Sequence, residues 1–186
     1  MNTSLSGKLL IASPYLSDPN FLRTVVLIVS HDEQGAFGLS LNRPTNKRLS
    51  DVVELSLPAT KIRDDDWIYE GGPVDGPLLA VHSMSGVGSP VIEESVDIWI
   101  TSEEEHLRLL LTRTDIQVRF AAKYSGWGPG QLDSEMEAGG WLVGQADSDI
   151  VFEDADQIWE SSVKRCGHDV LASISPGLRF DDPTVN

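Results

Sequence analysis

Short apolar runs separated by glycine, proline, asparagine and aspartate dominate the first half of the chain. Runs of this length, rich in β-branched and aromatic residues, are typical of strands. We predict strands at residues 8–12, 24–30, 36–42, 67–69 and 78–82. The second and third runs are joined by His31-Asp32-Glu33-Gln34-Gly35, a polar loop whose length and glycine favour an antiparallel hairpin.

The second half alternates between strand-like and helix-like segments. Strands are predicted at residues 96–100, 116–123, 141–145 and 149–152, with a short helix after a glycine-rich turn. A helix at residues 103–112 is indicated by a capping box of Ser102 and Glu105. The inward face of this helix comprises Leu107, Leu110 and Leu111.

A last helix is predicted at residues 155–166, ending at Gly167, because glycine most easily adopts the left-handed conformation that stops a helix. The mixed order of elements indicates an α+β fold rather than a regular alternation around a parallel sheet. With 186 residues and no repeat or long linker, we expect a single domain over residues 1–186. Residues 181–186 have the composition of a frayed tail.

The charge balance narrows the classes of partner. Fourteen Lys and Arg against 29 Asp and Glu give a net charge of −15, which repels phosphate backbones and anionic lipid. Direct nucleic-acid binding and membrane binding are therefore disfavoured. Positive charge is concentrated only in the segment 43–63, whose basic residues are Arg43, Lys47, Arg48, Lys61 and Arg63.

Cysteine content and hydropathy point to the cytoplasm. A single cysteine, Cys166, can form neither an internal disulfide nor a cysteine-based zinc site, which agrees with a reducing compartment. The apolar run at residues 9–12 is too short for a secretory signal, and no run approaches the about 20 residues needed to span a bilayer. We expect a cytoplasmic protein without a membrane segment.

The densest cluster of conformationally special residues is Gly126-Trp127-Gly128-Pro129-Gly130-Gln131. It follows a predicted strand and precedes a predicted helix, where a phosphate-binding loop would lie. It fails as a nucleotide motif because Gln131 replaces the third glycine and Pro129 has no N–H. We interpret it first as a structural turn fixed by Trp127, with a ligand or partner surface as the alternative.

Two other motifs leave the same choice open. Gly71-Gly72-Pro73 is a tight connection or, alternatively, exposed backbone lining a cleft shared with the glycine-rich turn. Asn42-Arg43-Pro44 ends a predicted strand, and Arg43 is the side chain best suited to clamp a carboxylate or phosphate. The alternative is an arginine that bonds carbonyls or an internal carboxylate such as Glu70.

Signals for catalysis or metal binding are weak. His31, Asp32 and Glu33 are consecutive, and consecutive loop residues rarely converge on one ion, so no metal site is predicted. The sequence has no nucleophile elbow, no S-x-x-K set and no H-E-x-x-H motif. We therefore assign no catalytic residue and no cofactor, and we favour a structural role for Cys166.

An ordered set of motifs resembles the bacterial AlgH/YqgE family over nearly the whole chain. These motifs are Gly7-Lys8-Leu9-Leu10-Ile11-Ala12-Ser13-Pro14, His31 with Gly35-Ala36-Phe37-Gly38-Leu39, Leu41-Asn42-Arg43-Pro44, Gly71-Gly72-Pro73-Val74 and Gly126-Trp127-Gly128-Pro129-Gly130-Gln131-Leu132. The resemblance implies a two-layer α+β fold in which a bent, partly barrel-like, mostly antiparallel sheet carries helices on its outside. It also implies a cytoplasmic protein with no established enzymatic activity. The family name comes from a proposed role in regulating transcription of exopolysaccharide genes.

Three classes of function remain open. The favoured one is a non-catalytic binding or regulatory protein that acts through a protein or small-molecule partner. The second is an enzyme or binder for an anionic metabolite or nucleotide, which uses Arg43, backbone N–H groups near residues 126–130, and His31 as acid or base. The third, direct nucleic-acid binding through the segment 43–63, is least favoured. The candidate binding surface comprises His31, Asn42, Arg43, Pro44, Gly71, Gly72, Pro73, Gly126, Trp127, Gly128, Pro129, Gly130 and Gln131.

Overall fold

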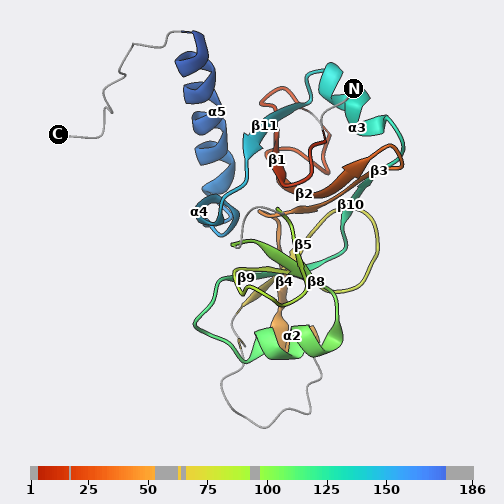
Figure 1. Cartoon of the computed structure of the whole chain (residues 1–186), viewed down its shortest axis with the longest axis vertical. Coiled ribbons are helices and arrows are strands. Elements are labelled where there is room, and N and C mark those ends of the chain that lie inside the picture. Colours follow the sequence, from red (N-terminus) through yellow and green to blue (C-terminus); the bar gives the residue numbers. More distant parts are fainter. Residues whose placement is uncertain (1–3, 17, 53–62, 64–65, 93–96, 175–186) are drawn as a thin grey trace, which may run out of the picture.

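The computed structural model describes residues 4–16, 18–52, 63, 66–92 and 97–174, with side chains through Gly167. The described strands form two sheets (Figure 1). The five-stranded sheet has the order β10 (Ser125–Trp127), β3 (Gly35–Ser40), β2 (Val25–Asp32), β1 (Lys8–Ala12) and β11 (Trp141–Gln145). The six-stranded sheet has the order β4 (Pro44–Arg48), β5 (Trp67–Glu70), β9 (Val118–Ala122), β6 (Leu79–His82), β8 (Trp99–Thr101) and β7 (Ser89–Pro90).

Strand pairing confirms the predicted α+β class with mostly antiparallel strands. Only β5 and β9 pair in parallel, and neither sheet closes into a barrel within the described ranges. The helices are α1 (Leu49–Val52), α2 (Glu104–Leu111), α3 (Gln131–Glu137), α4 (Ser148–Val151) and α5 (Ile158–Ile174). None of the described helices is long and apolar enough to cross a membrane.

The five-stranded sheet is apolar on both faces because both are covered. Leu9 and Ile11 of β1 join the apolar cluster that packs with α4 and α5, whereas Leu10 and Ala12 join the cluster that contains Leu132 of α3. Alternate residues of a strand point to opposite faces, so a continuous apolar run is what a two-sided strand requires. Figure 1 shows α5 and α3 on either side of this sheet.

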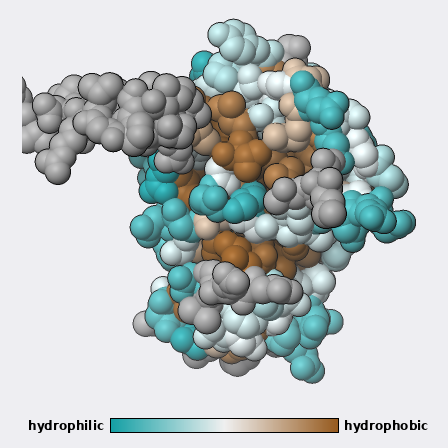
Figure 2. Space-filling model, turned by 45° about the horizontal axis from the view of Figure 1, so that its top comes forward, coloured by the Kyte–Doolittle hydropathy of each residue, from teal (hydrophilic) through white to brown (hydrophobic). Residues whose placement is uncertain are grey.

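The six-stranded sheet carries α2 on one face. Leu110 and Leu111 of α2 pack with Ile68 and Phe120, as the apolar spacing predicted. The predicted capping box is wrong: Glu103 occupies the N-cap position without a side-chain cap bond, and its N–H donates instead to Thr101 Oγ1 at 3.1 Å. On the face of the protein seen in Figure 2, apolar side chains reach the surface in patches between hydrophilic ones.

Two predicted elements are corrected by the structure. Residues 149–152 are not a strand, because the Asp147 side chain accepts the N–H of Ile150 at 2.9 Å and caps α4. Helix α5 begins at Ile158 and continues through Gly167, so this glycine does not end the helix. The predicted tail, residues 181–186, and Val96 at the start of a predicted strand lie outside the described residues.

The hairpin of β2 and β3 is antiparallel, as predicted, but its turn is shorter. Asp32 pairs with Gly35, so the strands extend to a two-residue turn and His31 belongs to β2 rather than to a loop. Gly35 has a φ of +131°, and a Cβ there would collide with the Trp127 carbonyl. This position therefore requires glycine on two counts.

Candidate functional site

The glycine-rich segment begins with a strand that the sequence did not predict. Ser125, Gly126 and Trp127 pair with β3 as strand β10. Gly128, Pro129 and Gly130 then turn the chain into α3, and the Gly128 N–H donates to Gln131 Oε1 at 3.1 Å. This backbone donor is therefore already bonded within the turn.

The Gly71-Gly72-Pro73 connection lies against the start of β10. The Gly71 carbonyl accepts the Ser125 hydroxyl at 3.1 Å, and the position of a Cβ on Gly72 is taken by the Tyr124 backbone. The structure therefore brings this motif and Gly126 together, through close backbone packing.

Arg43 lies at the other end of the hairpin. Its Nε donates to Thr24 Oγ1 at 2.9 Å, and its Nη2 donates to the carbonyls of Pro19 and Leu22. Asn42 is also bonded, because its side chain accepts the Val25 N–H at 3.0 Å.

The separation of Arg43 from the glycine-rich turn follows from the register of the hairpin. Next to Asn42 lies Val25, whereas next to Trp127 lies Ala36, the partner of His31. Six residues of strand β2, at about 3.3 Å each, place the two motifs about 20 Å apart. The structure therefore does not bring Arg43 and the glycine-rich turn to one site.

His31 is nearly enclosed. Its Nδ1 accepts the Leu5 N–H at 3.1 Å, and its Nε2 lies 3.9 Å from Asp133 of α3. Within the described ranges no group of three or more His, Cys, Asp or Glu side chains is placed to hold a metal ion.

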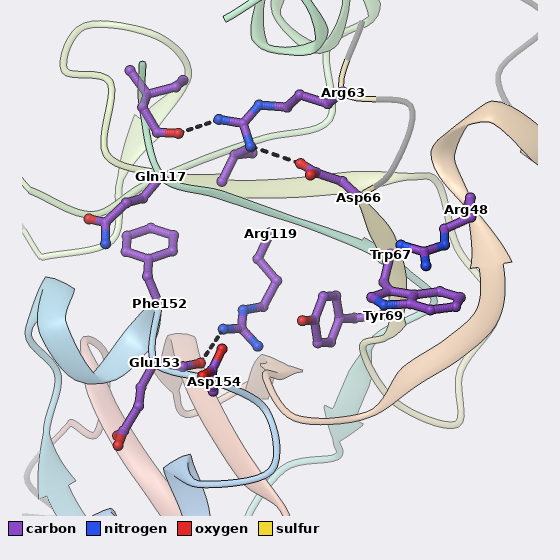
Figure 3. A pocket seen from close by; sticks show the side chains of 12 residues that line it. Arg48, Arg63, Asp66, Trp67, Tyr69, Gln117, Arg119, Phe152, Glu153 and Asp154 are labelled. Carbon is purple, nitrogen blue, oxygen red and sulfur yellow. Dashed lines mark hydrogen bonds and ion pairs between the residues drawn. The ribbon is translucent and has the colours of Figure 1, made fainter. Parts of the chain in front are cut away.

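A cavity of about 500 Å³ lies between the six-stranded sheet and the connection from α4 to α5 (Figure 3). Strands β4, β5 and β9 supply five of its twelve lining residues. The residues that line it are Arg48, Arg63, Asp66, Trp67, Tyr69, Ile116, Gln117, Val118, Arg119, Phe152, Glu153 and Asp154. None of the sequence-predicted surface residues is among them, although Arg48 and Arg63 belong to the basic segment. Lys61 of that segment lies outside the described residues.

Arg119 is the most deeply placed charge of this cavity. It is only 7% exposed, it donates to the carbonyls of Leu41 and Glu153, and its guanidinium lies 4.5 Å from the Tyr69 ring centre. No described carboxylate lies within ion-pair distance of it. Burial lowers the pKa of Arg119, because the charged form loses solvation. The arginine nevertheless stays charged, so the cavity wall carries a buried cation.

Two aromatic side chains stand beside Arg119. Trp67 and Tyr69 are two residues apart on β5 and therefore lie on the same face of the sheet. Trp67 is 40% exposed, and the Arg48 guanidinium lies 3.3 Å from its ring centre. A guanidinium this close to an indole face makes a cation–π contact. The edge of the cavity is thus both aromatic and cationic.

Two other charged side chains of the cavity, Arg63 and Glu153, have close partners. Arg63 bridges to Asp66 at 2.8 Å and also donates to the carbonyls of Arg113 and Ile116. The Glu153 carboxylate accepts the Ser161 hydroxyl at 2.7 Å. The hydrogen-bond partners of Arg119 are carbonyls, and the Asp154 carboxylate attracts its charge from beyond ion-pair distance.

A smaller hollow of about 350 Å³ continues this cavity along the sheet. The two share Trp67, Tyr69 and Asp154, and the hollow adds Pro44 and Asp156 at its far side. The larger cavity has three arginines and three carboxylates in its lining, whereas the charged residues of the smaller hollow are Asp154 and Asp156.

Comparison with known proteins places this architecture in a widespread group. A family model described as AlgH-like matches residues 9–171. A UPF0301 protein of Streptomyces avermitilis is 34% identical over 193 residues, which cover 99% of this chain and 96% of that protein. A UPF0301 protein of Ruegeria pomeroyi is 36% identical over 173 residues, which cover 90% of this chain and 94% of that protein.

Two solved structures share the fold. The solution structure of the AlgH protein from Pseudomonas aeruginosa matches with a TM-score of 0.72 at 29% identity, and the match covers 98% of both chains. An X-ray structure of a Corynebacterium diphtheriae protein matches with a TM-score of 0.69 at 22% identity, over 89% of this chain and 88% of that one.

Proposed function

The chain belongs to the AlgH-like family, and we propose that it is a non-catalytic cytoplasmic regulatory protein that binds a small anionic molecule in the cavity beside β5. The observation that carries this proposal is Arg119, a buried cation on the cavity wall with no carboxylate at ion-pair distance among the described side chains. Buried charges in proteins are normally paired. An anionic ligand would supply the missing partner.

The aromatic wall narrows the class of ligand. The rings of Trp67 and Tyr69 adjoin the cavity, and Trp67 stays 40% exposed although the Arg48 guanidinium covers one face, so a flat group can pack against this edge. The nearby Arg48 adds a second positive charge at the edge. A planar molecule with a carboxylate or phosphate group fits both features.

The chemistry of the lining supports binding rather than turnover. Among the described residues it contains no Ser, Thr, Cys, His or Lys, and two of its carboxylates already have close partners, Asp66 in an ion pair and Glu153 at a hydroxyl. A nucleophile or a free acid–base pair is what most catalytic mechanisms require. The described lining instead combines charged groups with flat aromatic surface.

Arg119 also links the ligand site to two other segments of the fold. Its two carbonyl partners, Leu41 and Glu153, belong to the segment after β3 and to the connection after α4. An anion that accepts hydrogen bonds from the same guanidinium would weaken or shift both of these hydrogen bonds. A protein partner that reads the ligand state would therefore sense a change in how these segments meet.

The surface predicted from the sequence stays a proposal for the protein partner. Gly126 and Val74 are exposed side by side, where Val74 pairs with Tyr124 just before β10. His31, Asn42 and Arg43 are engaged in bonds within the fold. We therefore place the partner at the Gly71–Gly126 end of that surface.

A thermal-shift screen tests the ligand proposal. Purified protein is heated with aromatic carboxylates, nucleotides and sugar phosphates, beside Arg48→Gln, Trp67→Ala and the control Arg108→Gln, which lies on α2 and pairs with Glu104. A ligand at 100 times its Kd raises the free energy of unfolding by about 2.7 kcal/mol, which is a shift of about 5–10 °C. Both cavity variants are expected to lose the shift and the control to keep it. Equal shifts in all variants, or none in the native chain, would overturn the proposal.

A further inference from the structure

A second cavity lies apart from the first, between the five-stranded sheet and helix α5, with a volume of about 290 Å³. Its apolar wall is formed by Leu9 and Ile11 of β1 together with Ile150 of α4. Its polar side is formed by Ser162 and Cys166, which are one helical turn apart on α5. The volume is at the lower end of the about 300–1,000 Å³ typical of ligand sites, so an occupant must be small.

The Ser162 hydroxyl is the group that this cavity leaves unsatisfied. Ser162 is 2% exposed, and its Oγ has no hydrogen-bond partner among the described residues. A buried hydroxyl normally finds a partner, because leaving it unbonded costs stability. A ligand atom that accepts this O–H would remove that cost.

Gly144 of β11 keeps the cavity open. A Cβ at this position would lie 3.0 Å from Ile11 Cδ1 and 3.7 Å from Cys166 Sγ, so any larger residue would project into the space beside the thiol. Glycine inside a strand weakens the strand and often marks the close approach of another group. The backbone here therefore leaves room that a side chain would fill.

Arg165 and Asp147 also line the cavity, on its solvent-exposed side. Arg165 bonds Asp147 through Nη1 at 2.8 Å, and both side chains are about half exposed. A guanidinium has five N–H donors, so Arg165 can bond a second anion while it keeps Asp147. Positive charge thus stands next to an apolar space with one buried hydroxyl.

We propose that this cavity binds a short aliphatic carboxylate. The alkyl chain would lie against Leu9, Ile11 and Ile150, and the carboxylate would accept from Ser162 and Arg165. The match is one of shape and chemistry: a small apolar space, a hydroxyl without an acceptor and a guanidinium at one end. The competing occupant is ordered water, which would also satisfy the hydroxyl.

The single cysteine of the chain makes the site directly measurable. Cys166 lines the cavity, so the rate at which iodoacetamide alkylates the full-length protein reports access to it. Octanoate is the probe, and its Kd is measured in parallel by calorimetry. Bound octanoate is expected to slow alkylation at least fivefold. Unchanged alkylation with no heat of binding would show that water alone fills the cavity and would overturn the proposal.

Two variants and a matched control sharpen the test. Ser162→Ala removes one hydrogen bond and is expected to weaken octanoate binding about fivefold, which corresponds to about 1 kcal/mol. Gly144→Ala is expected to weaken it at least tenfold by filling the space. Gly167→Ala adds the same methyl group to α5 where nothing lies within 4 Å, so it is expected to leave binding unchanged. Equal affinity in all four proteins would show non-specific adsorption and would overturn the site.

Discussion

The two sheets of this protein use tryptophan in opposite ways. Beside the five-stranded sheet, Trp127 and Trp141 are buried, and both indole N–H groups donate to one carboxylate oxygen of Glu135, at 3.0 and 2.9 Å. Phe21 packs against both rings. On the six-stranded sheet, Trp67 is half-exposed and its face is covered by a guanidinium at the edge of a cavity. The Trp127–Trp141 group is therefore buried with both N–H groups bonded, whereas Trp67 remains partly exposed to solvent.

The buried tryptophans stabilise the fold, whereas the half-exposed Trp67 belongs to the candidate binding site. The conspicuous motif of the sequence, the glycine-rich segment around Trp127, contributes a strand, a turn and a packed ring. The candidate site is made instead by residues with no motif, on three strands and on the segments beside them, which meet only in the folded chain. A conspicuous motif is therefore evidence of a demanding backbone conformation before it is evidence of a ligand.

Truncating the two kinds of tryptophan gives the largest expected contrast. Trp127→Ala is expected to lower the free energy of unfolding by about 3–5 kcal/mol, because a buried ring leaves a cavity. Trp67→Ala is expected to lower it by about 1 kcal/mol or less. Urea denaturation measures both, and for a single domain we expect one cooperative transition. Equal losses would show that the half-exposed ring is as structural as the buried one.

The carboxylates of the two regions give the next contrast. In Glu135→Gln the two indole N–H groups face either a neutral amide oxygen or an amide N–H₂, which cannot accept. Loss of the charged acceptor is expected to lower the free energy of unfolding by about 2–3 kcal/mol. Asp154→Asn, at the exposed edge of the cavity, is expected to change stability by about 0.5 kcal/mol or less. The measurement is again urea denaturation at pH 7. A loss below about 0.5 kcal/mol for Glu135→Gln would refute the role of this carboxylate.

Acid is expected to act on the six-stranded sheet through His82 of β6. This residue is fully buried, and burial, reinforced by His106, lowers its pKa from 6.5 to about 4. The neutral ring is thus favoured in the fold, and its contribution is complete above pH 6.5 and lost as pH falls towards 4. Between pH 7.5 and pH 5 the loss is about 2 kcal/mol.

The variant His82→Leu isolates this contribution. Unfolding free energies at pH 7.5 and pH 5 are compared in the native chain and the variant, since the carboxylates titrate alike in both. The pH dependence of the variant is expected to be smaller by about 2 kcal/mol. An identical dependence in the two proteins would show that His82 is not the titrating group.

The smallest expected effect is a gain in α5, which covers the five-stranded sheet. Gly167 lies inside this helix with an exposed Cα and open space around it. Gly167→Ala is expected to raise the free energy of unfolding by about 0.5–1 kcal/mol, because alanine is the better helix former. Thermal denaturation measures it. Destabilisation would show that the glycine is needed to end or bend the helix, as the sequence first indicated.

Much of the fold could be predicted because the local signals agree with the tertiary structure. Strand β1 has the predicted bounds, and the β2–β3 hairpin and α2 are also confirmed. Strand β10 was missed because glycines obscure its pairing with β3, and α4 was mistaken for a strand because Ile150 and Val151 are β-branched. In each error a single contact, a neighbouring strand or the Asp147 cap, overrides the local propensity.

The cavity could not be predicted as a unit because its walls come from distant parts of the sequence. Two signals were nevertheless present. Arg119 interrupts the apolar strand β9, and charged side chains are rarely buried in such a strand unless they have partners. Trp67 and Tyr69 alternate on β5, which indicates one aromatic face. Only the parallel pairing of β5 with β9 shows that these signals belong to one site.

The pairing of β1 with β11 has a consequence for how the protein is made. Lys8 lies opposite Gln145, so β1 can pair with β11 only after a further 137 residues have been synthesised. At a synthesis rate of about 5–20 residues per second, roughly 7–27 s pass on the ribosome before that partner emerges. During this time one edge of an apolar strand is open to wrong partners. Protease protection of ribosome-bound chains should therefore rise only once β11 has left the exit tunnel, and earlier protection would show that β1 is shielded by other means.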